Sequence, residues 1–588
     1  MKRALCRSLY LRCRFVLLAS SMAVPGTALA QAVPNTTLPT REEVDPKDVP
    51  TQAPPSSVRI DSRGAVEAAS CPLDGSDIRI NLAQVRFEGA ADRALATEIL
   101  ALLGNVPAAD LGDQPISVVC RIRDRANMAL RSAGYIASIQ IPAQEIANNV
   151  LVLKVVTARI TEIRVRGDVG RFRAALEPRL EAIKALDPLN ERDVERLLLL
   201  AGDIPGLDVQ LSLRPAGTAP GDVIGDLTVD TRAATLLFNI QNSGSKQLGR
   251  EIASIRAELY GLTGLSDRTA LTVSNSLQFK ESHVVQLSHD MALGSRGIRL
   301  AVRGSVALSD PDIENLDLRS RSLIGGFDLS VPLLRRVNST IGAKGGFEFL
   351  DQRTKIKSGA TSVPFNQDRL RIGFARLDGS WLGRRADGGE TWHVDSSVEI
   401  RQGFDIFGAS KRGIVQDGFS PSRFDGDAKA TVIRGSLDAG VRFTPALSFN
   451  ASAYGQWANR SLLNIEEFSL GNLTYGRGYD PGANGGDRVI ALRAEPRIRL
   501  PEFAGFRLEL MGFYDWVKLY NLDPGTVETG RVLRSVGGGA RLLLPGRIVL
   551  DVTYAKPLDR ALVSDLQRPG NRLLVTLTTQ LYPWRSRR

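Results

Sequence analysis

Arg477 and Asp515 are the two residues of this chain whose types and settings best suit a specific ion-pair chemistry. Arg477 lies in a glycine-rich stretch, 473–482, whose turn-forming residues predict a loop. A guanidinium that meets a carboxylate in a partly desolvated setting makes a charge-assisted, bidentate contact with a defined geometry. The chemistry expected of this pair is therefore to hold a loop in place.

Two strands of alternating polarity follow this loop and are joined at 501–505. Successive side chains of a strand point to opposite faces of the sheet. In the second strand one face is apolar or aromatic, with Leu508, Leu510, Gly512, Tyr514 and Trp516. The other face carries the charges, with Arg507, Glu509, Met511, Phe513 and Asp515. Such a sheet fits a membrane barrel with a wet lumen. Asp515 is predicted to point into that lumen, where Arg477 can meet it.

The order of these residues resembles the signature of a known family. The loop carries Gly-Arg-Gly-Tyr at 476–479, the next strand but one carries Phe-Tyr-Asp at 513–515, and Glu-Phe-Ser-Leu-Gly at 467–471 leads into the loop. Together they resemble the two-partner-secretion outer-membrane transporters, the TpsB family of the haemolysin and filamentous-haemagglutinin transporter/activator type. The alternative is an ordinary glycine-rich turn and a chance Phe-x-Asp.

This resemblance implies roles for five residues. In that family the Arg-Gly-Tyr loop tip folds back into the barrel and contacts the Phe-x-Asp strand. Arg477 and Asp515 would then form a lock between loop and barrel, Gly478 would permit the tight loop tip, and Tyr479 and Phe513 would pack beside it. Exchanging the two charges is expected to restore part of the activity that each single substitution removes.

Residues 1–30 have the pattern of a secretory signal peptide. A basic head precedes a short apolar run at 15–24, and Ala-Leu-Ala at 28–30 forms a small-residue cleavage site. That run is too short to cross a bilayer as a helix, and no later segment holds enough uninterrupted apolar residues. Removing the peptide's five basic residues reduces the formal charge from +11 to +6. We expect no nucleic-acid partner, because the remaining acids and bases are interspersed.

Residues 31–75 are rich in proline and are predicted to form an extended periplasmic linker. Relatives in the family that the chain resembles often carry a plugging helix near the N-terminus, threaded through the barrel. Here only residues 41–49 could form such a helix, and Pro46 interrupts it. The sequence leaves open whether a plug exists.

Two small α/β modules are predicted at 76–157 and 158–231. In the first, a strand at 78–87 is followed by helices at 91–102 and 117–132 and by two more strands. Its end, from Gly134 to Gln144, resembles a polypeptide-transport-associated (POTRA) domain, so the modules are called POTRA 1 and POTRA 2. They are expected to capture an extended polypeptide as an added strand at a sheet edge. The alternative is that they are only spacers.

Cys71 and Cys120 are the cysteines that remain after the signal peptide. Because the periplasm is oxidising, a disulfide between them is predicted. The alternative is two unpaired, buried thiols.

From 232 to 588, alternating strands predict an all-β antiparallel transmembrane barrel of about sixteen strands after the α+β POTRA modules. Short and long connections alternate, as expected for periplasmic turns and external loops. The stretch 460–487 is then the sixth external loop, folded inward. A soluble β-sandwich is the alternative, but faces as charged as Arg493, Glu495, Arg497 and Arg499 fit a lumen better.

No catalytic or metal-binding pattern is convincing. His283, His289 and His393 are widely scattered, and no nucleophile elbow or phosphate-binding loop occurs. His289 and Asp290 faintly resemble a barrel-protease pair, but their strand is expected to end on the periplasmic side. We therefore expect no enzyme activity, no cofactor and no metal.

The predicted function is secretion of a partner exoprotein, of adhesin-like or haemolysin-like β-helical type, across the bacterial outer membrane without nucleotide hydrolysis. The expected partners are that exoprotein, docked on the POTRA modules, outer-membrane lipid, and the barrel-assembly machinery during biogenesis. The alternatives are an assembly or insertion factor for other outer-membrane proteins and, less favoured, a passive porin. A porin would need neither POTRA modules nor an Arg-Gly-Tyr loop.

Overall fold

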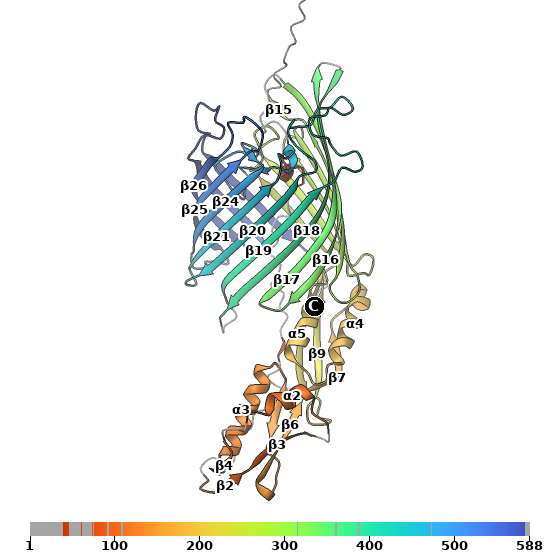
Figure 1. Cartoon of the computed structure of the whole chain (residues 1–588), viewed down its shortest axis with the longest axis vertical. Coiled ribbons are helices and arrows are strands. Elements are labelled where there is room, and N and C mark those ends of the chain that lie inside the picture. Colours follow the sequence, from red (N-terminus) through yellow and green to blue (C-terminus); the bar gives the residue numbers. More distant parts are fainter. Residues whose placement is uncertain are drawn as a thin grey trace, which may run out of the picture. The chain divides into compact units, whose positions relative to one another are not determined.

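The computed structural model describes residues 39–45, 60–61, 73, 76–90, 93–106, 110–313, 316–358, 361–385, 389–471 and 473–582. The predicted signal peptide, Cys71 and most of the predicted linker lie outside these residues. None of the described helices is long and apolar enough to cross a membrane. The strands form a closed barrel and several smaller sheets (Figure 1).

POTRA 1 begins with a stretch that changes partners half-way along. β2 (Arg79–Leu82) pairs with β4 (Gly112–Pro115), whereas β3 (Gln84–Gly89) pairs with β6 (Val150–Thr157). The single strand predicted over 78–87 is therefore wrong, because its two halves belong to different sheets. The remaining elements are α2 (Thr97–Leu103), α3 (Val118–Ser132) and β5 (Ala137–Gln140).

The core of POTRA 1 lies between the sheet β3-β6-β5 and the two helices. Helix α3 buries an apolar stripe at helical spacing, which includes Val119, Ile122, Ala126 and Leu130. Cys120 is buried in the same helix and is disulfide-bonded. Its pairing with Cys71 stays a prediction.

POTRA 2 has a sheet of order β1-β8-β9-β7. The strand β1 (Ile60–Asp61) comes from the predicted linker and pairs in parallel with β8. Helix α5 is capped by the Asn190 side chain, which accepts from the Arg192 amide at 3.0 Å. The other elements are β7 (Arg159–Arg166), α4 (Arg173–Lys184), α5 (Glu191–Gly202), β8 (Leu207–Pro215) and β9 (Asp222–Thr231).

Asp222 of POTRA 2 binds one arginine from each of the two POTRA modules. Its Oδ1 accepts from Arg159 Nε at 2.9 Å and from Arg93 Nη2 at 2.8 Å. The hydrogen bond from Arg159, followed by that from Arg93, lowers the pKa of Asp222 from 3.8 to about 2. Because the folded-state pKa is depressed, this stabilisation is present above pH 4 or so and is lost as the pH falls towards about 2.

Asp222→Asn is therefore expected to destabilise the POTRA region at neutral pH and to remove this part of its acid sensitivity. We expect a loss of about 1 kcal/mol, since Arg159 is partly exposed and water screens the contact. Limited proteolysis of the detergent-purified chain between pH 7 and pH 3 would measure both effects. Equal cleavage of the variant and the wild type at neutral pH would contradict the prediction.

Sixteen strands close into an antiparallel barrel by pairing β10 with β28, and the predicted fold class is confirmed. A two-residue strand, β15 (Asp312–Ile313), pairs with β16 in addition. The barrel strands are β10 (Ala234–Gln241), β11 (Ile252–Tyr260), β12 (Arg268–Ser276), β13 (Ser282–Ala292), β14 (Arg299–Ser309), β16 (Leu316–Arg335), β17 (Ser339–Ser358), β18 (Thr361–Arg384), β19 (Glu390–Gly403), β20 (Thr431–Arg442), β21 (Leu447–Ala458), β24 (Arg488–Arg499), β25 (Arg507–Tyr520), β26 (Arg531–Leu544), β27 (Ile548–Pro557) and β28 (Arg572–Leu581).

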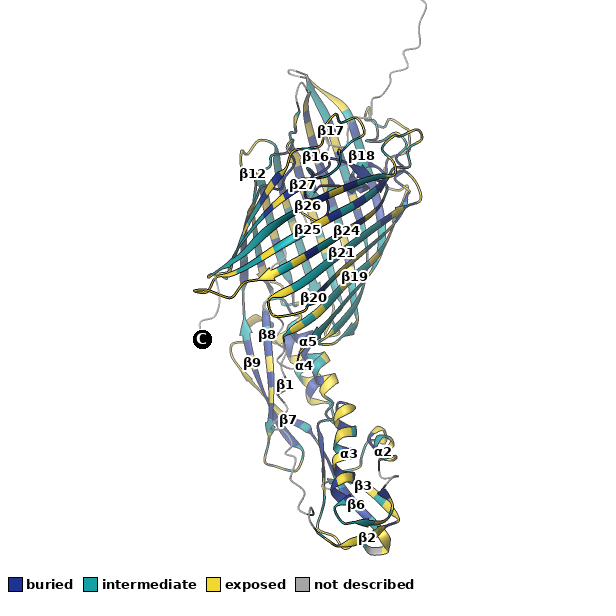
Figure 2. Ribbon diagram, turned by 90° about the vertical axis from the view of Figure 1, so that its left-hand side faces the viewer, coloured by how far each residue is buried: buried dark blue, intermediate teal, exposed yellow. Residues whose placement is uncertain are grey.

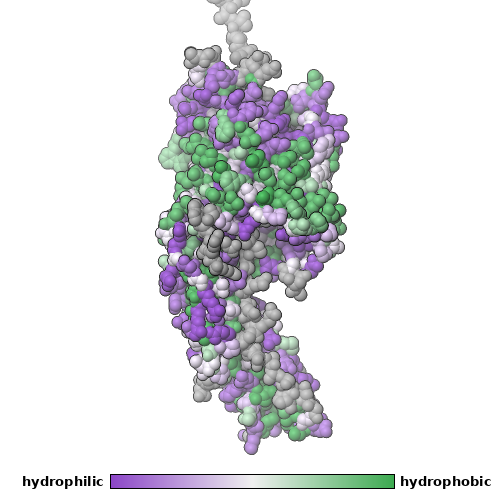
Figure 3. All heavy atoms as spheres, turned by 180° about the vertical axis from the view of Figure 1, so that it is seen from behind, coloured by the Kyte–Doolittle hydropathy of each residue, from purple (hydrophilic) through white to green (hydrophobic). Residues whose placement is uncertain are grey.

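Side chains alternate between the lumen and the outer surface along these strands, and burial alternates with them (Figure 2). On β17, for example, Glu348 is fully buried in the lumen, while its neighbours Phe347 and Phe349 point outward. On the face drawn in Figure 3, hydrophobic side chains gather in a belt over the strands, with hydrophilic side chains beyond it. A belt of this kind is what the hydrocarbon core of a membrane requires.

Candidate locking site inside the barrel

The connection between β21 and β24 is an ordered structure packed on the inner wall of the barrel. A 3₁₀ turn, Asn464–Glu466, precedes a two-residue ladder of β22 (Phe468–Ser469) and β23 (Gly485–Gly486). The loop residues Leu470 and Tyr479 are buried against inward-facing side chains of β24, β25 and β26, which include Val489, Val517 and Leu533. These contacts hold the loop 459–487 within the lumen.

Arg477, at the loop tip, is bound by two carboxylates from the barrel wall. Its backbone amide donates to Asp515 Oδ2 at 3.0 Å, and its Nη2 donates to Asp515 Oδ1 at 3.1 Å. Its Nη1 donates to Glu495 Oε2 at 2.8 Å. The side chain of Asp515 is fully buried, and that of Arg477 is 6% exposed. A buried cation and its anions are held in one geometry, because separating them would leave charges without partners.

Aromatic and polar neighbours complete the surroundings of this pair. The Arg477 guanidinium lies over the Phe513 ring, with Cζ 3.5 Å from the ring centroid. Ser535 Oγ donates to Asp515 Oδ2 at 3.2 Å, and Arg493 Nε lies 3.6 Å from Asp515 Oδ1. The five residues Arg477, Asp515, Glu495, Phe513 and Arg493 are called the tip cluster below.

The structure also places the two other loop residues singled out from the sequence, Gly478 and Tyr479. The left-handed turn at the loop tip is made by their neighbour Gly476, with φ of 75°. Gly478 allows the loop tip to approach the wall closely, because a Cβ there would lie 2.7 Å from Pro557 N and 2.9 Å from Ser535 Cβ. Tyr479 is fully buried, and its hydroxyl contacts Arg534 O at 2.9 Å.

Gly478→Ala is expected to push the loop tip off the wall. Since a backbone atom of Pro557 opposes the new methyl group, the strain falls on the loop, at a cost of about 1–3 kcal/mol. The purified variant should show more frequent channel openings in planar bilayers than the wild type. Gly570→Ala is the matched control, because a Cβ at Gly570 meets nothing within 4 Å. Identical traces for all three proteins would contradict the prediction.

A second group of buried charges ties the start of the same loop to an N-terminal helix. Helix α1 (Arg41–Val44) is a single turn with a capping box formed by Thr40 and Glu43. Arg41 Nη2 donates to Glu348 Oε1 at 2.7 Å on β17, and its Nη1 donates to Glu466 Oε2 at 2.9 Å in the loop. Val44 is buried among interior apolar side chains. Residues 41–44 of the predicted linker thus form a short helix inside the barrel, a question that the sequence left open.

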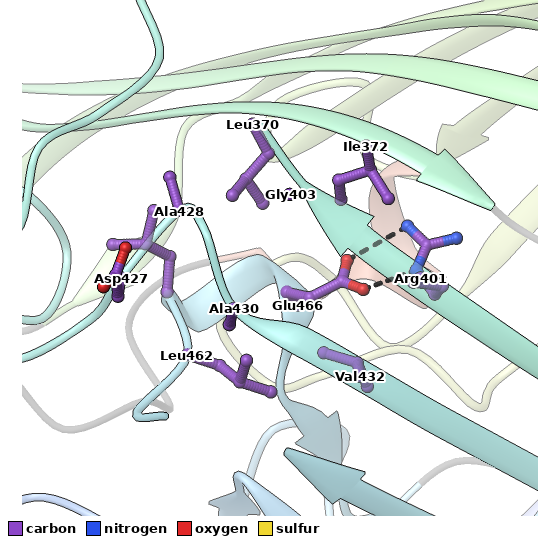
Figure 4. A pocket seen from close by; sticks show the side chains of 11 residues that line it. Leu370, Ile372, Arg401, Gly403, Asp427, Ala428, Ala430, Val432, Leu462 and Glu466 are labelled. Atoms are coloured by element: carbon purple, nitrogen blue, oxygen red, sulfur yellow. Dashed lines mark hydrogen bonds and ion pairs between the residues drawn. The ribbon is translucent and has the colours of Figure 1, made fainter. Parts of the chain in front are cut away.

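Arg401 of β19 closes this second group. It lies 2.6 Å from Glu348 Oε2 and 2.6 Å from Glu466 Oε1, and Figure 4 shows the contact with Glu466 beside a small pocket lined by Leu370, Ile372 and Val432. Arg303 adds a further contact to Glu348 at 2.9 Å. The group Arg41, Glu348, Arg401, Glu466 and Arg303 is called the plug cluster below.

Several members of both clusters were missed from the sequence. Glu495 and Arg493 had been assigned to the lumen face but not to the lock; the direct pairing of Arg493 with Asp515 in the β24–β25 register could have indicated them. Glu348, Arg401 and Glu466 gave no local signal, because their partners are far away in the sequence. Among the described residues, no group of His, Cys, Asp and Glu could hold a metal ion.

Comparisons with known proteins agree on one family. The family model described as haemolysin secretion/activation protein ShlB/FhaC/HecB matches residues 228–542. The heme/hemopexin transporter protein HuxB of Haemophilus influenzae is 23% identical over 93% of this chain and 96% of its own length. The outer membrane transporter CdiB of Dickeya dadantii is 23% identical over 62% of this chain and 63% of its own.

Solved structures agree on the fold. CdiB from Escherichia coli has a TM-score of 0.68 at 17% identity, covering 88% of this chain and 94% of that one. CdiB from Acinetobacter baumannii has a TM-score of 0.62 at 13% identity, covering 94% of this chain and 95% of that one.

Proposed function

Since the chain belongs to the ShlB/FhaC/HecB family of haemolysin secretion/activation proteins and is an outer-membrane transporter, we propose that it secretes one partner exoprotein through the barrel lumen. The observation that carries this proposal is the buried contact of Arg477 with Asp515 and Glu495. A loop held by buried charges at its tip obstructs the lumen and can be released as a unit. A large unfolded cargo needs such a gate, whereas a diffusion channel would stay open.

In the proposed cycle, both charge clusters hold the resting transporter closed. The tip cluster holds the loop tip to β24 and β25, and the plug cluster holds helix α1 to β17, β19 and the loop. Arrival of the exoprotein releases α1 and the loop, and the chain then passes outward and folds outside. Folding outside drives export, without nucleotide hydrolysis.

We propose that the exoprotein docks on the POTRA modules by strand addition at the outer edges of β3 and β7. Among the described residues, neither edge carries a strand partner. The opposite edges of the two sheets are less suitable. In POTRA 2, β1 already pairs with the free side of β8, and in POTRA 1 the Asn127 side chain accepts from the Ile139 amide of β5 at 2.9 Å.

A photo-cross-linking residue in place of Glu162 on β7 should capture a secretion-stalled exoprotein. Failure to capture it while secretion persists would contradict this docking mode.

The proposal is tested by deleting the gene in cells that make a candidate exoprotein, such as one encoded beside it. The exoprotein should remain in the periplasm, and restoring the chain should return it to the medium. If the chain were an assembly factor, its deletion would instead deplete many outer-membrane proteins. If it were a porin, its deletion would alter only the uptake of small solutes. Either of those outcomes with normal secretion would overturn the proposal.

A further inference from the structure

The external connection between β19 and β20 covers the upper edge of β18. β18 is 24 residues long and β19 only 14. Residues 361–371 of β18 therefore pair with β17 on one side but not with β19 on the other. The chain from 404 to 420, called the edge loop below, lies along this edge. Its Phe404 and Ser410 amides donate to the β18 carbonyls of Arg371 at 2.8 Å and Arg369 at 2.9 Å.

The aromatic side chains of the edge loop lie on the outside of the barrel. Phe347 and Phe349 point outward, because Glu348 between them is buried in the lumen. The Phe404 ring centroid is 6.2 Å from that of Phe347, and the Phe407 centroid is 6.0 Å from that of Phe349. The edge loop therefore extends the lipid-facing surface at the external end of these strands.

The edge loop leaves large apolar side chains uncovered. Phe407 is 72% exposed, and Ile406 beside it is 41% exposed. A phenylalanine stabilises a structure when its ring is buried away from water, so a loop that faced only water would gain nothing from these exposed residues. Their continuity with Phe349 indicates that they enter the membrane.

Two outward-facing arginines lie above these aromatic residues. Arg321 of β16 and Arg353 of β17 are directly opposite each other in the sheet, and both are exposed. Arg353 lies two outward positions beyond Phe349 on the same strand. Arg353 lies over the Phe419 ring, with Cζ 5.7 Å from the ring centroid. The carboxylate of Asp351, between Phe349 and Arg353 on β17, pairs with Arg371, and neither Arg321 nor Arg353 forms an ion pair among the residues that the structure describes. Like charges directly opposite each other in a sheet repel. An anion between them would remove this repulsion.

We propose that Arg321 and Arg353 bind the phosphate of an anionic glycolipid in the outer leaflet, while Phe407 and Ile406 lie among its acyl chains. A guanidinium group binds phosphate through two parallel hydrogen bonds, and two arginines can bind one phosphate from opposite sides. The edge loop would thereby fix the long strands β16–β18 at the membrane surface. This site requires the outer-membrane location but not the exoprotein.

Binding of phosphorylated lipid A to the full chain in detergent micelles tests the phosphate contact. Arg321→Ser/Arg353→Ser should weaken binding by about tenfold or more, because each arginine near an anionic lipid surface contributes about 1 kcal/mol. Arg507→Ser is the matched control, since Arg507 is an exposed arginine at the opposite end of the strands. Heat-modifiable migration on gels verifies that each barrel is folded.

Equal affinity of the double variant and the wild type for lipid A, or equal binding of dephosphorylated lipid A, would overturn the phosphate contact.

A second measurement tests how deeply the edge loop enters the membrane. A fluorophore on Phe407→Cys in nanodiscs should be quenched by brominated acyl chains, whereas one on Val527→Cys, 70% exposed in another external loop, should not. Absence of quenching at 407 would overturn the membrane contact even if the arginines bind phosphate.

Discussion

Arg477→Ala is expected to insert normally into the outer membrane and to abolish secretion of the exoprotein. The substitution leaves the fully buried Asp515 with Arg493 as its remaining cationic neighbour among the described residues, and leaves Glu495 with Arg497. Breaking a buried ion pair by removing one partner costs about 3–5 kcal/mol, which is enough to unseat the loop. The measurements are the secreted fraction of the exoprotein and the conductance of the purified barrel, which should rise.

Arg319→Ala is the matched control, because Arg319 pairs with Asp310 in an exposed setting and should leave secretion unchanged. The exchanged pair Arg477→Asp/Asp515→Arg is now expected to restore little, unlike the expectation from sequence. It would place an aspartate beside Glu495 and an arginine beside Arg493. Normal secretion by Arg477→Ala would show that the tip cluster is not a lock.

Glu348→Gln is expected to give the largest rise in ion conductance of any single substitution in the plug cluster. Glu348 is completely buried and accepts from Arg41, Arg401 and Arg303, so neutralising it leaves three guanidinium groups without their common anion. Repulsion among them should expel helix α1 from the lumen. Planar-bilayer recordings should show long open states, and the N-terminal segment should be cleaved more readily by added protease.

Asp328→Asn is the matched control for this substitution. Asp328 also faces the lumen and binds Arg303 at 3.1 Å, but its ion-pair partners among the described residues, Arg303 and Lys344, do not belong to helix α1. It should therefore alter conductance far less. Equal conductance of Glu348→Gln and Asp328→Asn would mean that α1 is not held by the plug cluster.

The barrel could be predicted from the sequence because strand parity repeats along every strand. Along 508–516, alternate residues already fall into a lipid-facing set and a lumen-facing set. A shift of the strand pairing by one residue would turn every charged side chain towards lipid. Arg477 and Asp515 could be singled out because a recognisable motif surrounds each of them. Their role in gating stays a prediction.

The plug cluster could not be predicted because its contacts depend on tertiary packing alone. Arg41 meets Glu348 and Glu466 across separations of 307 and 425 residues, and four helical residues carry no periodicity to indicate a helix. The pairing of β1 with β8 was missed for a similar reason, since two residues in a proline-rich stretch give no strand pattern. The break between β2 and β3 depends on which distant strand each half pairs with.

The most direct test asks whether the exoprotein passes through this lumen. Ser436 and Leu437 are neighbours on β20: Ser436 faces inward, where its hydroxyl bonds that of Ser397 at 2.7 Å, and Leu437 faces lipid. A photo-cross-linking residue is placed at each position in turn, and secretion is stalled by a folded domain fused to the exoprotein. We predict cross-links from position 436 and none from 437. Cross-links from 437 alone, or none from 436 while the exoprotein is stalled in transit, would contradict passage through the barrel.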